Sequence, residues 1–305
     1  MLLFLSGCRA PAPPAAPQAH VAARVAASAP VRHVIIVSID GLRPDAIDRA
    51  PAPTLQRLMR EGAFSLRAET ILPSKTLPSH VSMLTGVSPE THGITWNTDR
   101  TRQYGAVRVP TVFELAEQAG LRTALFLGKR KLRHLVREGT GDWVSYPRTD
   151  VILTADQVAG EVVEYLAFEQ PNLVFVHIPD PDLAGHTVGW MSAPYRWAVR
   201  RADRAVAHIH AAAIRAYGED FVLIVTSDHG GEGRTHGRTQ ASDILIPWIV
   251  WGKGISTGEI TGEIRTFDTG ATALWLLGID PPRNWDGEPV RSVLHSVSPA
   301  TGEER

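Results

Sequence analysis

The chain has 305 residues, 44% of them hydrophobic, and a formal net charge of −1 at pH 7. That is enough apolar material for one large α/β domain or two small ones. The near-neutral charge argues against a strongly basic, polyanion-binding surface, so we expect no nucleic acid polymer as a partner.

Residues 1–30 differ in composition from the rest of the chain. The apolar run MLLFLSGC ends at Cys8, the only cysteine, and an Ala/Pro-rich spacer follows it. The run is too short to span a bilayer, and the spacer is too poor in large apolar groups to pack. The pattern resembles a bacterial lipoprotein signal. It implies a lipid anchor at Cys8 and a place in the cell envelope, facing the periplasm or exterior; an incidental cysteine is the alternative.

From residue 33 onward, apolar runs alternate with helical patterns. HVIIVSID at 33–40 is a continuous β-branched run, typical of a buried parallel strand. The other segments follow in chain order: helix 54–64 with a stop at its glycine, helix 111–120 with a stop at its glycine, strand 122–128, helix 154–170, strand 172–178, helix 194–217, strand 221–228, a shorter strand 246–252 and helix 268–279. This alternation predicts a single domain of the α/β class, a three-layer α/β/α sandwich with a mostly parallel central sheet.

Three of the predicted strands end in acidic residues or run into them. VSID ends at Asp40, VHIPDPD ends at Asp182, and VTSD ends at Asp228. Ligands of such sheets bind outside the carboxyl ends of the strands. Each aspartate alone is typical of a turn. Three like charges at one sheet edge repel one another, however, unless a cation lies among them.

Histidines accompany two of these aspartates. His186 follows Asp182 by four residues, which lets both side chains face one point in a helical turn. His229 follows Asp228 directly, and His236 comes seven residues later. Carboxylate and imidazole suit zinc, which takes about four such ligands, although manganese and iron accept similar ones. The candidates divide into two sets, one of Asp182, His186 and His236 and the other of Asp40, Asp228 and His229.

The second set has room for one more oxygen, which Thr76 in the stretch SKTLPSH can supply. Pro78 predicts a short helix that begins at the proline. The Thr76 hydroxyl would then lie near the positive end of this helix, where anions bind. For a lone threonine before a helix, an N-cap is the ordinary interpretation.

Six motifs occur in the order and approximate spacing of those of the alkaline phosphatase superfamily. They are VSIDGLRPD, SKTLPSHVSMLTG, HGITWN, PDLAGH, TSDHGG and THG, and the resemblance spans about residues 34–289. The branch that they resemble is the nucleotide pyrophosphatase/phosphodiesterase family. The resemblance implies two zinc ions and an alkaline phosphatase-like catalytic domain. We place this domain at 31–291 and a disordered tail at 292–305.

The resemblance also implies roles for the two sets. Thr76 corresponds to the nucleophile of the family and ligates one metal together with Asp40, Asp228 and His229, while the other set binds the second zinc. A dication stabilises the alkoxide of a threonine, and two dications can clamp an in-line displacement at phosphorus. Thr76 would attack phosphorus first, and the phosphothreonine would then be hydrolysed.

Four more residues are candidates for contacts with the substrate. Asn97 corresponds to an asparagine that contacts the phosphoryl oxygen in the related enzymes; a turn residue is the alternative. Lys129 and Lys131 follow a predicted strand and either contact a phosphate oxygen or belong to a solvated charged face. Trp96 leads a group of tryptophans that either line a wall for a base or aryl group or pack in the core.

The sequence therefore predicts a two-zinc phosphoesterase that acts on phosphodiester or pyrophosphate bonds of a small substrate. A phosphomonoesterase on the same site is the first alternative, favoured if the two lysines reach the phosphate. A sulfatase would need a Cys or Ser for its aldehyde, and a headgroup transferase normally has several membrane helices. A non-catalytic metal-binding envelope lipoprotein is the alternative of another class. No obligate protein partner is implied.

Overall fold

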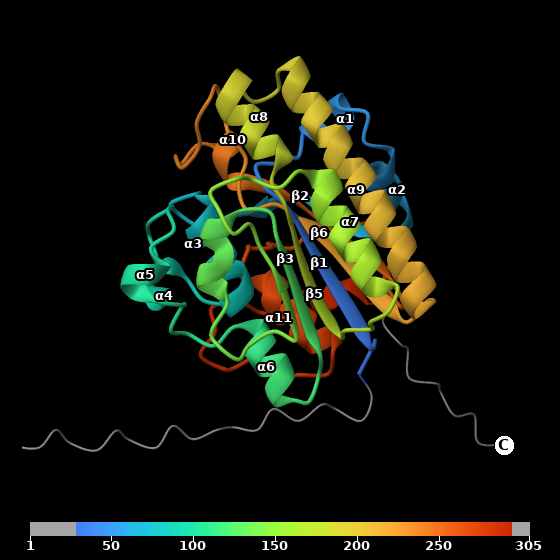
Figure 1. The fold of residues 1–305 in the computed structure, drawn as a ribbon. Helices are drawn as coiled ribbons and strands as arrows, with labels where there is room; N and C mark the ends of the chain where they lie inside the picture. The colour runs from blue at the N-terminus through green and yellow to red at the C-terminus, as the bar shows by residue number, and fades with distance from the viewer. Residues whose placement is uncertain (1–28, 295–305) are drawn as a thin grey trace, which may run out of the picture.

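One mixed sheet runs through the centre of the molecule. The computed structural model describes residues 29–294, so Cys8 lies outside the described residues. Eight strands pair in the order β4-β3-β5-β1-β6-β7-β2-β8. Figure 1 shows β3, β5, β1 and β6 side by side in this sheet. The bounds of the eight strands are β1 (His33–Ile39), β2 (Ala63–Glu69), β3 (Thr123–Leu127), β4 (Trp143–Ser145), β5 (Leu173–Ile178), β6 (Phe221–Thr226), β7 (Leu245–Gly252) and β8 (Gly258–Glu259).

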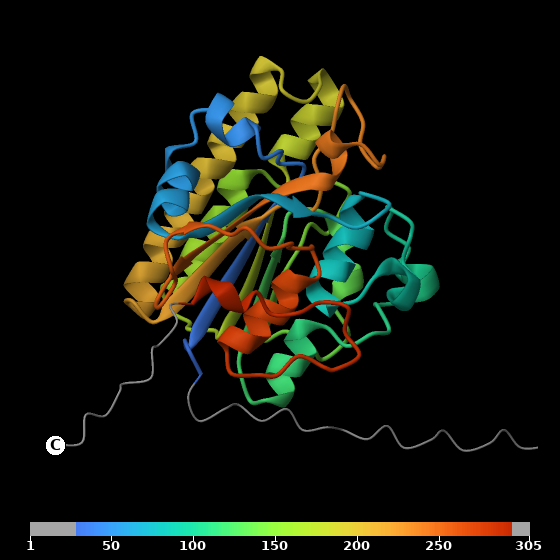
Figure 2. The same ribbon diagram turned by 180° about the vertical axis from the view of Figure 1, so that it is seen from behind.

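Helices cover both faces of this sheet (Figures 1 and 2). One face carries α1 (Ala46–Arg49), α2 (Pro53–Glu61), α7 (Ala155–Leu166) and α9 (Ala193–Tyr217). The other carries α3 (Thr76–Thr85), α6 (Val112–Gln118) and α11 (Asp268–Leu276). The connections hold α4 (Pro89–His92), α5 (Thr101–Tyr104), α8 (Asp180–Val188), α10 (Ala241–Ile244) and the 3-10 helices η1 (Arg130–Leu135) and η2 (Arg291–Val293). The predicted three-layer α/β/α sandwich is confirmed.

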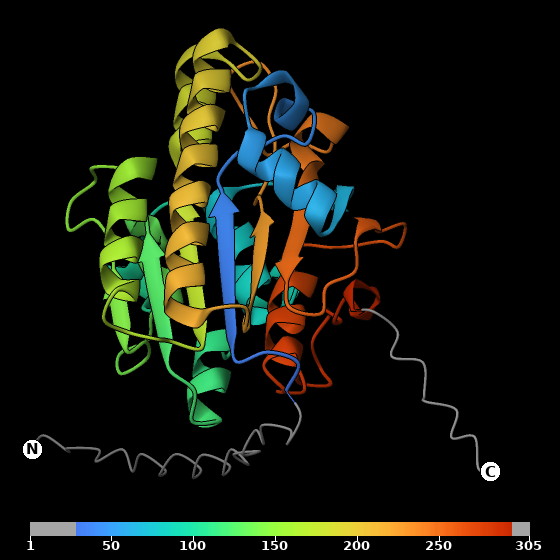
Figure 3. The same cartoon turned by 90° about the vertical axis from the view of Figure 1, so that its right-hand side faces the viewer.

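The side chains of β1 are buried on both faces of the sheet, which explains why the sequence of this strand is one apolar run. Ile35, Val37 and Ile39 pack into the core beneath α7 and α9. Val34 and Ile36 point the other way, into the core beneath α3 and α11. Because helices bury both faces, every residue of the strand is buried and no polar alternation appears. Figure 3 shows α9 lying lengthwise along the sheet beside β1.

The strands beyond β6 depart from a parallel sheet. β7 pairs antiparallel with both β6 and β2. The helix predicted within 54–64 ends at Glu61, directly before its expected glycine stop at Gly62, and the chain then enters β2, a strand that the sequence did not predict. β2 was missed because its seven residues are only partly buried and carry no continuous apolar run. β7 has eight residues and is longer than predicted.

The end of the domain lies beyond the predicted boundary at residue 291. Val293 is fully buried, and its carbonyl accepts a hydrogen bond from the Ser256 N–H at 2.8 Å. The first residues assigned to a disordered tail therefore belong to the fold. Within residues 29–294, no helix has the length and hydropathy needed to cross a membrane.

Candidate active site

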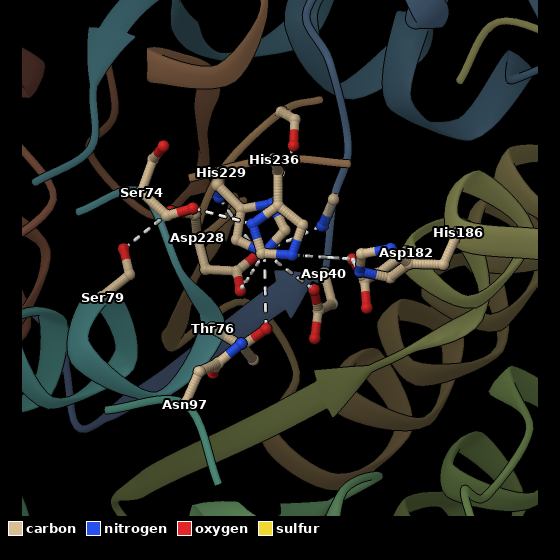
Figure 4. Close-up of polar contacts among 12 residues, drawn as sticks. Asp40, Ser74, Thr76, Ser79, Asn97, Asp182, His186, Asp228, His229 and His236 are labelled. Atoms are coloured by element: carbon tan, nitrogen blue, oxygen red, sulfur yellow. Dashed lines mark hydrogen bonds and ion pairs between the residues drawn. The ribbon is translucent and has the colours of Figure 1, made fainter. Parts of the chain in front are cut away.

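Three neighbouring strands bring the acidic residues to one edge of the sheet. Asp40 directly follows β1, Asp228 comes two residues after β6, and α8, which holds Asp182, begins two residues after β5. β5, β1 and β6 are parallel and lie side by side. Their carboxyl ends therefore meet, and the three carboxylates converge as predicted (Figure 4).

The loops that follow β1 and β5 contact each other directly. The Asp182 N–H donates a hydrogen bond to the Asp40 carbonyl at 3.0 Å. Gly41 lies in the left-handed region with φ at +74°, and a Cβ there would lie 2.9 Å from the Asp182 Cα. Glycine therefore allows the close approach that places the two aspartates together.

Helix α3 begins at Thr76 rather than at Pro78. Lys75 occupies the N-cap position with no side-chain cap, so the ordinary interpretation of Thr76 as an N-cap does not hold. Pro78 falls within the first turn, where an N–H would have no helical partner anyway. The Thr76 side chain is fully buried, and its Oγ1 lies 3.3 Å from His229 Nε2.

Thr76 belongs to what we call the inner cluster, four fully buried residues comprising Asp40, Thr76, Asp228 and His229. His229 Nε2 lies 3.4 Å from Asp40 Oδ1 and 3.3 Å from Asp228 Oδ2. Ligands that surround a tetrahedral ion at about 2.0–2.1 Å lie roughly 3.3 Å from one another. The separations in the inner cluster match that spacing.

The outer cluster consists of Asp182, His186 and His236. His186 Nε2 and His236 Nε2 lie 3.4 Å and 3.6 Å from the same oxygen, Asp182 Oδ1. His229 Nε2 is 4.0 Å from that oxygen, so the two clusters adjoin. The His186 side chain is 45% exposed, whereas the other two are 5% exposed. The outer cluster therefore opens to solvent on the His186 side.

The donor atoms of both clusters fit divalent cations. One oxygen of each aspartate is buried with no hydrogen-bond partner: Asp40 Oδ1, Asp182 Oδ1 and Asp228 Oδ2. Each histidine uses Nδ1 to donate to a backbone carbonyl: His186 to Arg234, His229 to Gly230 and His236 to Ser74. The Nε2 lone pairs thus point into the clusters, where that of His229 accepts from the Thr76 hydroxyl. This is the tautomer that metal-ligating histidines adopt. Nitrogen and carboxylate donors in this arrangement suit zinc.

The electrostatics of the site also favour bound cations. Burial, and then the nearby Asp40 and Asp182 charges, raise the pKa of Asp228 well above its usual value. Burial opposes ionisation of Asp40 as well, but the Lys129 ammonium holds the pKa of Asp40 well below its usual range. Burial lowers the pKa of His229 to about 3, so this imidazole is neutral at pH 7. The carboxylates need more positive charge than these side chains supply.

Asn97 and Lys131 come together beside the start of α3. Asn97 Oδ1 accepts a hydrogen bond from the Leu77 N–H at 2.9 Å and another from Lys131 Nζ at 3.0 Å. These two donors fix the amide orientation and direct its NH₂ group away from them. Burial, and then the nearby Lys129, lower the pKa of Lys131 to about 8.

Lys129 lies deeper than Lys131 and contacts the clusters themselves. Its Nζ donates to Asp40 Oδ2 at 2.7 Å and also to Asp182 Oδ2. Trp96 packs beside Tyr104, with ring centroids 4.9 Å apart. The predicted contacts of these residues with substrate stay predictions.

Two histidines that support the inner cluster were not predicted. His177 Nε2 donates to Asp40 Oδ2 at 2.9 Å from within β5. His80 Nδ1 donates to the Thr76 carbonyl at 2.7 Å, and its Nε2 accepts from Ser38 at 2.8 Å. The signal for His177 was available, because it is the one polar residue in the buried run LVFVHI and a buried polar group needs a partner.

The fold and the two clusters together define an α/β protein with a candidate two-metal site at the carboxyl edge of its sheet. The model of the type I phosphodiesterase / nucleotide pyrophosphatase family matches residues 34–238, and the chain belongs to this family. The chain is 28% identical over 220 residues to a bis(5'-adenosyl)-triphosphatase of Xenopus laevis, covering 65% of this chain and 46% of that protein. It is 22% identical to a GPI ethanolamine phosphate transferase of Emericella nidulans, covering 85% of this chain and 34% of that one.

Solved structures share the fold. Murine ectonucleotide pyrophosphatase/phosphodiesterase 5, as an inactive threonine-to-alanine variant in complex with AMP, superimposes with a TM-score of 0.74 at 16% identity, covering 87% of this chain and all of that one. A 2-O GAG sulfatase gives a TM-score of 0.71 at 15% identity, covering 87% of this chain and 74% of that one. The chain spans about half or less of the length of the two curated relatives named above.

Proposed function

We propose that this protein is a two-zinc phosphoesterase that cleaves phosphodiester or pyrophosphate bonds through a phosphothreonine at Thr76. The observation that carries the proposal is the buried Thr76 hydroxyl, 3.3 Å from His229 Nε2. It lies beside carboxylates that each leave one buried oxygen unpartnered. Membership in the phosphodiesterase family supports the reaction class.

The two clusters and Thr76 have different roles in the proposed reaction. The inner cluster would hold one ion and the outer cluster the other, and bound dications supply charge neutralisation and activation of an attacking oxygen. Thr76 Oγ1 loses its proton and forms the new bond to phosphorus while the bond to the leaving oxygen breaks, and the leaving oxygen takes up a proton. Water then displaces Thr76 from phosphorus, which regenerates the hydroxyl. Since the outer cluster is open beside His186, the leaving group can depart on that side.

Asn97 would orient the phosphoryl group. Its Oδ1 is held by the Leu77 N–H and by Lys131, so the NH₂ group remains to donate to a phosphoryl oxygen. An amide donor fixed in advance costs no reorganisation during the reaction.

A substrate panel tests the proposal. The chain, stripped of metal and reloaded with zinc, would be assayed on bis-p-nitrophenyl phosphate, p-nitrophenyl phosphate, diadenosine polyphosphates and p-nitrophenyl sulfate. We expect diesters or pyrophosphates to be cleaved and the sulfate to be untouched. A protein that holds two zinc ions but cleaves no phosphate ester would instead support the non-catalytic envelope protein.

A phosphomonoesterase on the same site is a second candidate, favoured by the position of Lys131. Its Nζ is 3.0 Å from Asn97 Oδ1, which brings a cation next to the amide proposed to bind phosphate. A monoester carries one more anionic oxygen than a diester, so an added cation favours it. If Lys131 serves a monoester, Lys131→Met will reduce turnover of p-nitrophenyl phosphate far more than that of the diester; an equal reduction favours the diesterase.

We also propose that a lipid at Cys8 anchors the protein in the cell envelope, where it would meet small phosphate esters. The support is the sequence pattern alone, since Cys8 lies outside the described residues. Membrane fractionation of the wild type and of Cys8→Ser tests this: the variant should move to the soluble fraction, and equal membrane content in both would refute the anchor.

A further inference from the structure

Lys129 is placed where it contacts both candidate metal clusters. It follows β3 and directly precedes η1, and it is 6% exposed. Gly128 permits this course of the chain, because a Cβ there would lie 2.7 Å from the Pro179 ring. The Lys129 ammonium donates to Asp40 Oδ2 of the inner cluster at 2.7 Å and to Asp182 Oδ2 of the outer cluster.

Lys129 leaves the ligating oxygens of both aspartates free. It binds Oδ2 of Asp40 and of Asp182, while Oδ1 of each is buried and unpartnered. Those Oδ1 atoms face histidine Nε2 atoms, at 3.4 Å for Asp40 and 3.6 Å for Asp182. One oxygen of each carboxylate thus serves the lysine and the other faces the histidines. The ammonium can therefore keep its place when cations bind.

Lys129 also supplies a fixed positive charge to the carboxylates. Asp40 and Asp228 are fully buried, and Asp182 is 4% exposed. Within residues 29–294, no other lysine or arginine forms an ion pair with any of these three. A buried carboxylate without a counter-ion is strongly unfavourable.

We propose that Lys129 is a permanent counter-ion of the site, a positioning residue that keeps the two clusters assembled when no metal is bound. This role rests on the proposed function only in assuming that both clusters take cations. It differs from a direct contact with substrate phosphate, because its largest effect falls on the metal-free protein. Bound zinc supplies positive charge to the same carboxylates, so the dependence on Lys129 shrinks as the clusters fill.

Thermal unfolding of the chelator-stripped and zinc-loaded chain tests the proposal. Lys129→Met should lower the Tm of the metal-free protein by roughly 5–10 °C, and zinc should remove most of that deficit. Lys131→Met is the matched control, since Lys131 is two residues away but its Nζ binds an amide rather than a carboxylate. It should leave the metal-free Tm within about 2 °C of the wild type.

A charge-compensated variant covers the case in which Lys129→Met does not fold. Lys129→Met/Asp182→Asn removes one carboxylate together with the ammonium, so it should recover part of the lost Tm. The proposal is overturned if the metal-free Tm of Lys129→Met equals that of the wild type. It is equally overturned if the deficit persists with zinc, or if the double variant is no more stable than the single one.

The same samples separate this proposal from the proposed function. Zinc content and ester hydrolysis of the wild type are measured alongside the melting curves. A wild type that holds two zinc ions without hydrolysing any ester refutes the phosphoesterase and leaves the result for Lys129 intact. An active wild type whose Lys129→Met variant melts normally without metal refutes only the counter-ion role.

Discussion

The inner and outer clusters differ in how completely the protein encloses them. The inner cluster lies at the ends of β1 and β6 and the start of α3, and none of its side chains is exposed. The outer cluster comes from α8 and the loop after β6, and its His186 is nearly half exposed. A dry, rigid site strengthens electrostatic interactions, whereas an open one admits water and lets products leave. This difference supports the proposed cycle, in which the nucleophile belongs to the inner cluster and the leaving group departs beside the outer one.

The largest effect should come from removing the inner hydroxyl. Thr76→Ala should reduce kcat by roughly 10³-fold or more, because it deletes the nucleophile of the proposed cycle. The two aspartates and His229 remain, so zinc content should stay near that of the wild type. Steady-state kinetics and metal analysis of the same preparation check both parts. Full activity in this variant would remove Thr76 from the mechanism.

Ligand substitutions should affect the two clusters unequally. Asp228→Asn should weaken zinc binding by about 100-fold, because the neutral amide removes a carboxylate charge at a fully buried position, where water cannot compensate. His186→Ala should cost roughly 10-fold, since water can reach that half-exposed position. Competition against a chromophoric chelator measures both. Equal losses would show that enclosure does not distinguish the clusters.

Residues that support the inner cluster should affect zinc affinity less than the residues proposed to bind the ion. His177→Leu removes the hydrogen bond to Asp40 Oδ2, and loss of such a partner typically costs 10–100-fold in metal affinity or activity. His210 provides a matched control, because it is a buried histidine on α9 with no contact to either cluster. His210→Leu should leave zinc affinity unchanged. A similar loss in both variants would point to general destabilisation.

The smallest effect concerns pH. Lys131 has a pKa of about 8 because burial disfavours its ammonium, so it loses its charge as the pH rises through 8. If that charge assists phosphate binding, kcat/KM should fall a fewfold above pH 8 in the wild type. Lys131→Arg stays charged, so its kcat/KM should fall less. Lys131→Met has no charge to lose, so its kcat/KM should be lower than that of the wild type but should not fall above pH 8. An identical fall in all three would assign it to another group.

The sequence could predict the parts of the two clusters that local patterns mark, and it could not predict the parts that depend on packing. The candidate ligands at the ends of β1, β5 and β6 were predictable, because apolar runs locate strands and parallel strands share an edge. The start of α3 at Thr76 was not, since Pro78 marks a first turn without fixing which residue of the turn it occupies. β2 was not predicted because its residues range from buried to exposed and form no continuous apolar run. The contact between Lys129 and the clusters depends on the pairing of β3 with β5. No pattern within a short stretch of sequence predicts that pairing.

The stereochemistry of hydrolysis tests the central claim most directly. One diastereomer of a chiral phosphorothioate diester would be hydrolysed in water enriched in heavy oxygen, and the configuration at phosphorus determined. Two successive in-line displacements, first by Thr76 and then by water, predict net retention, whether or not the intermediate accumulates. Net inversion would mean that water attacks phosphorus directly and that Thr76 never carries the phosphoryl group.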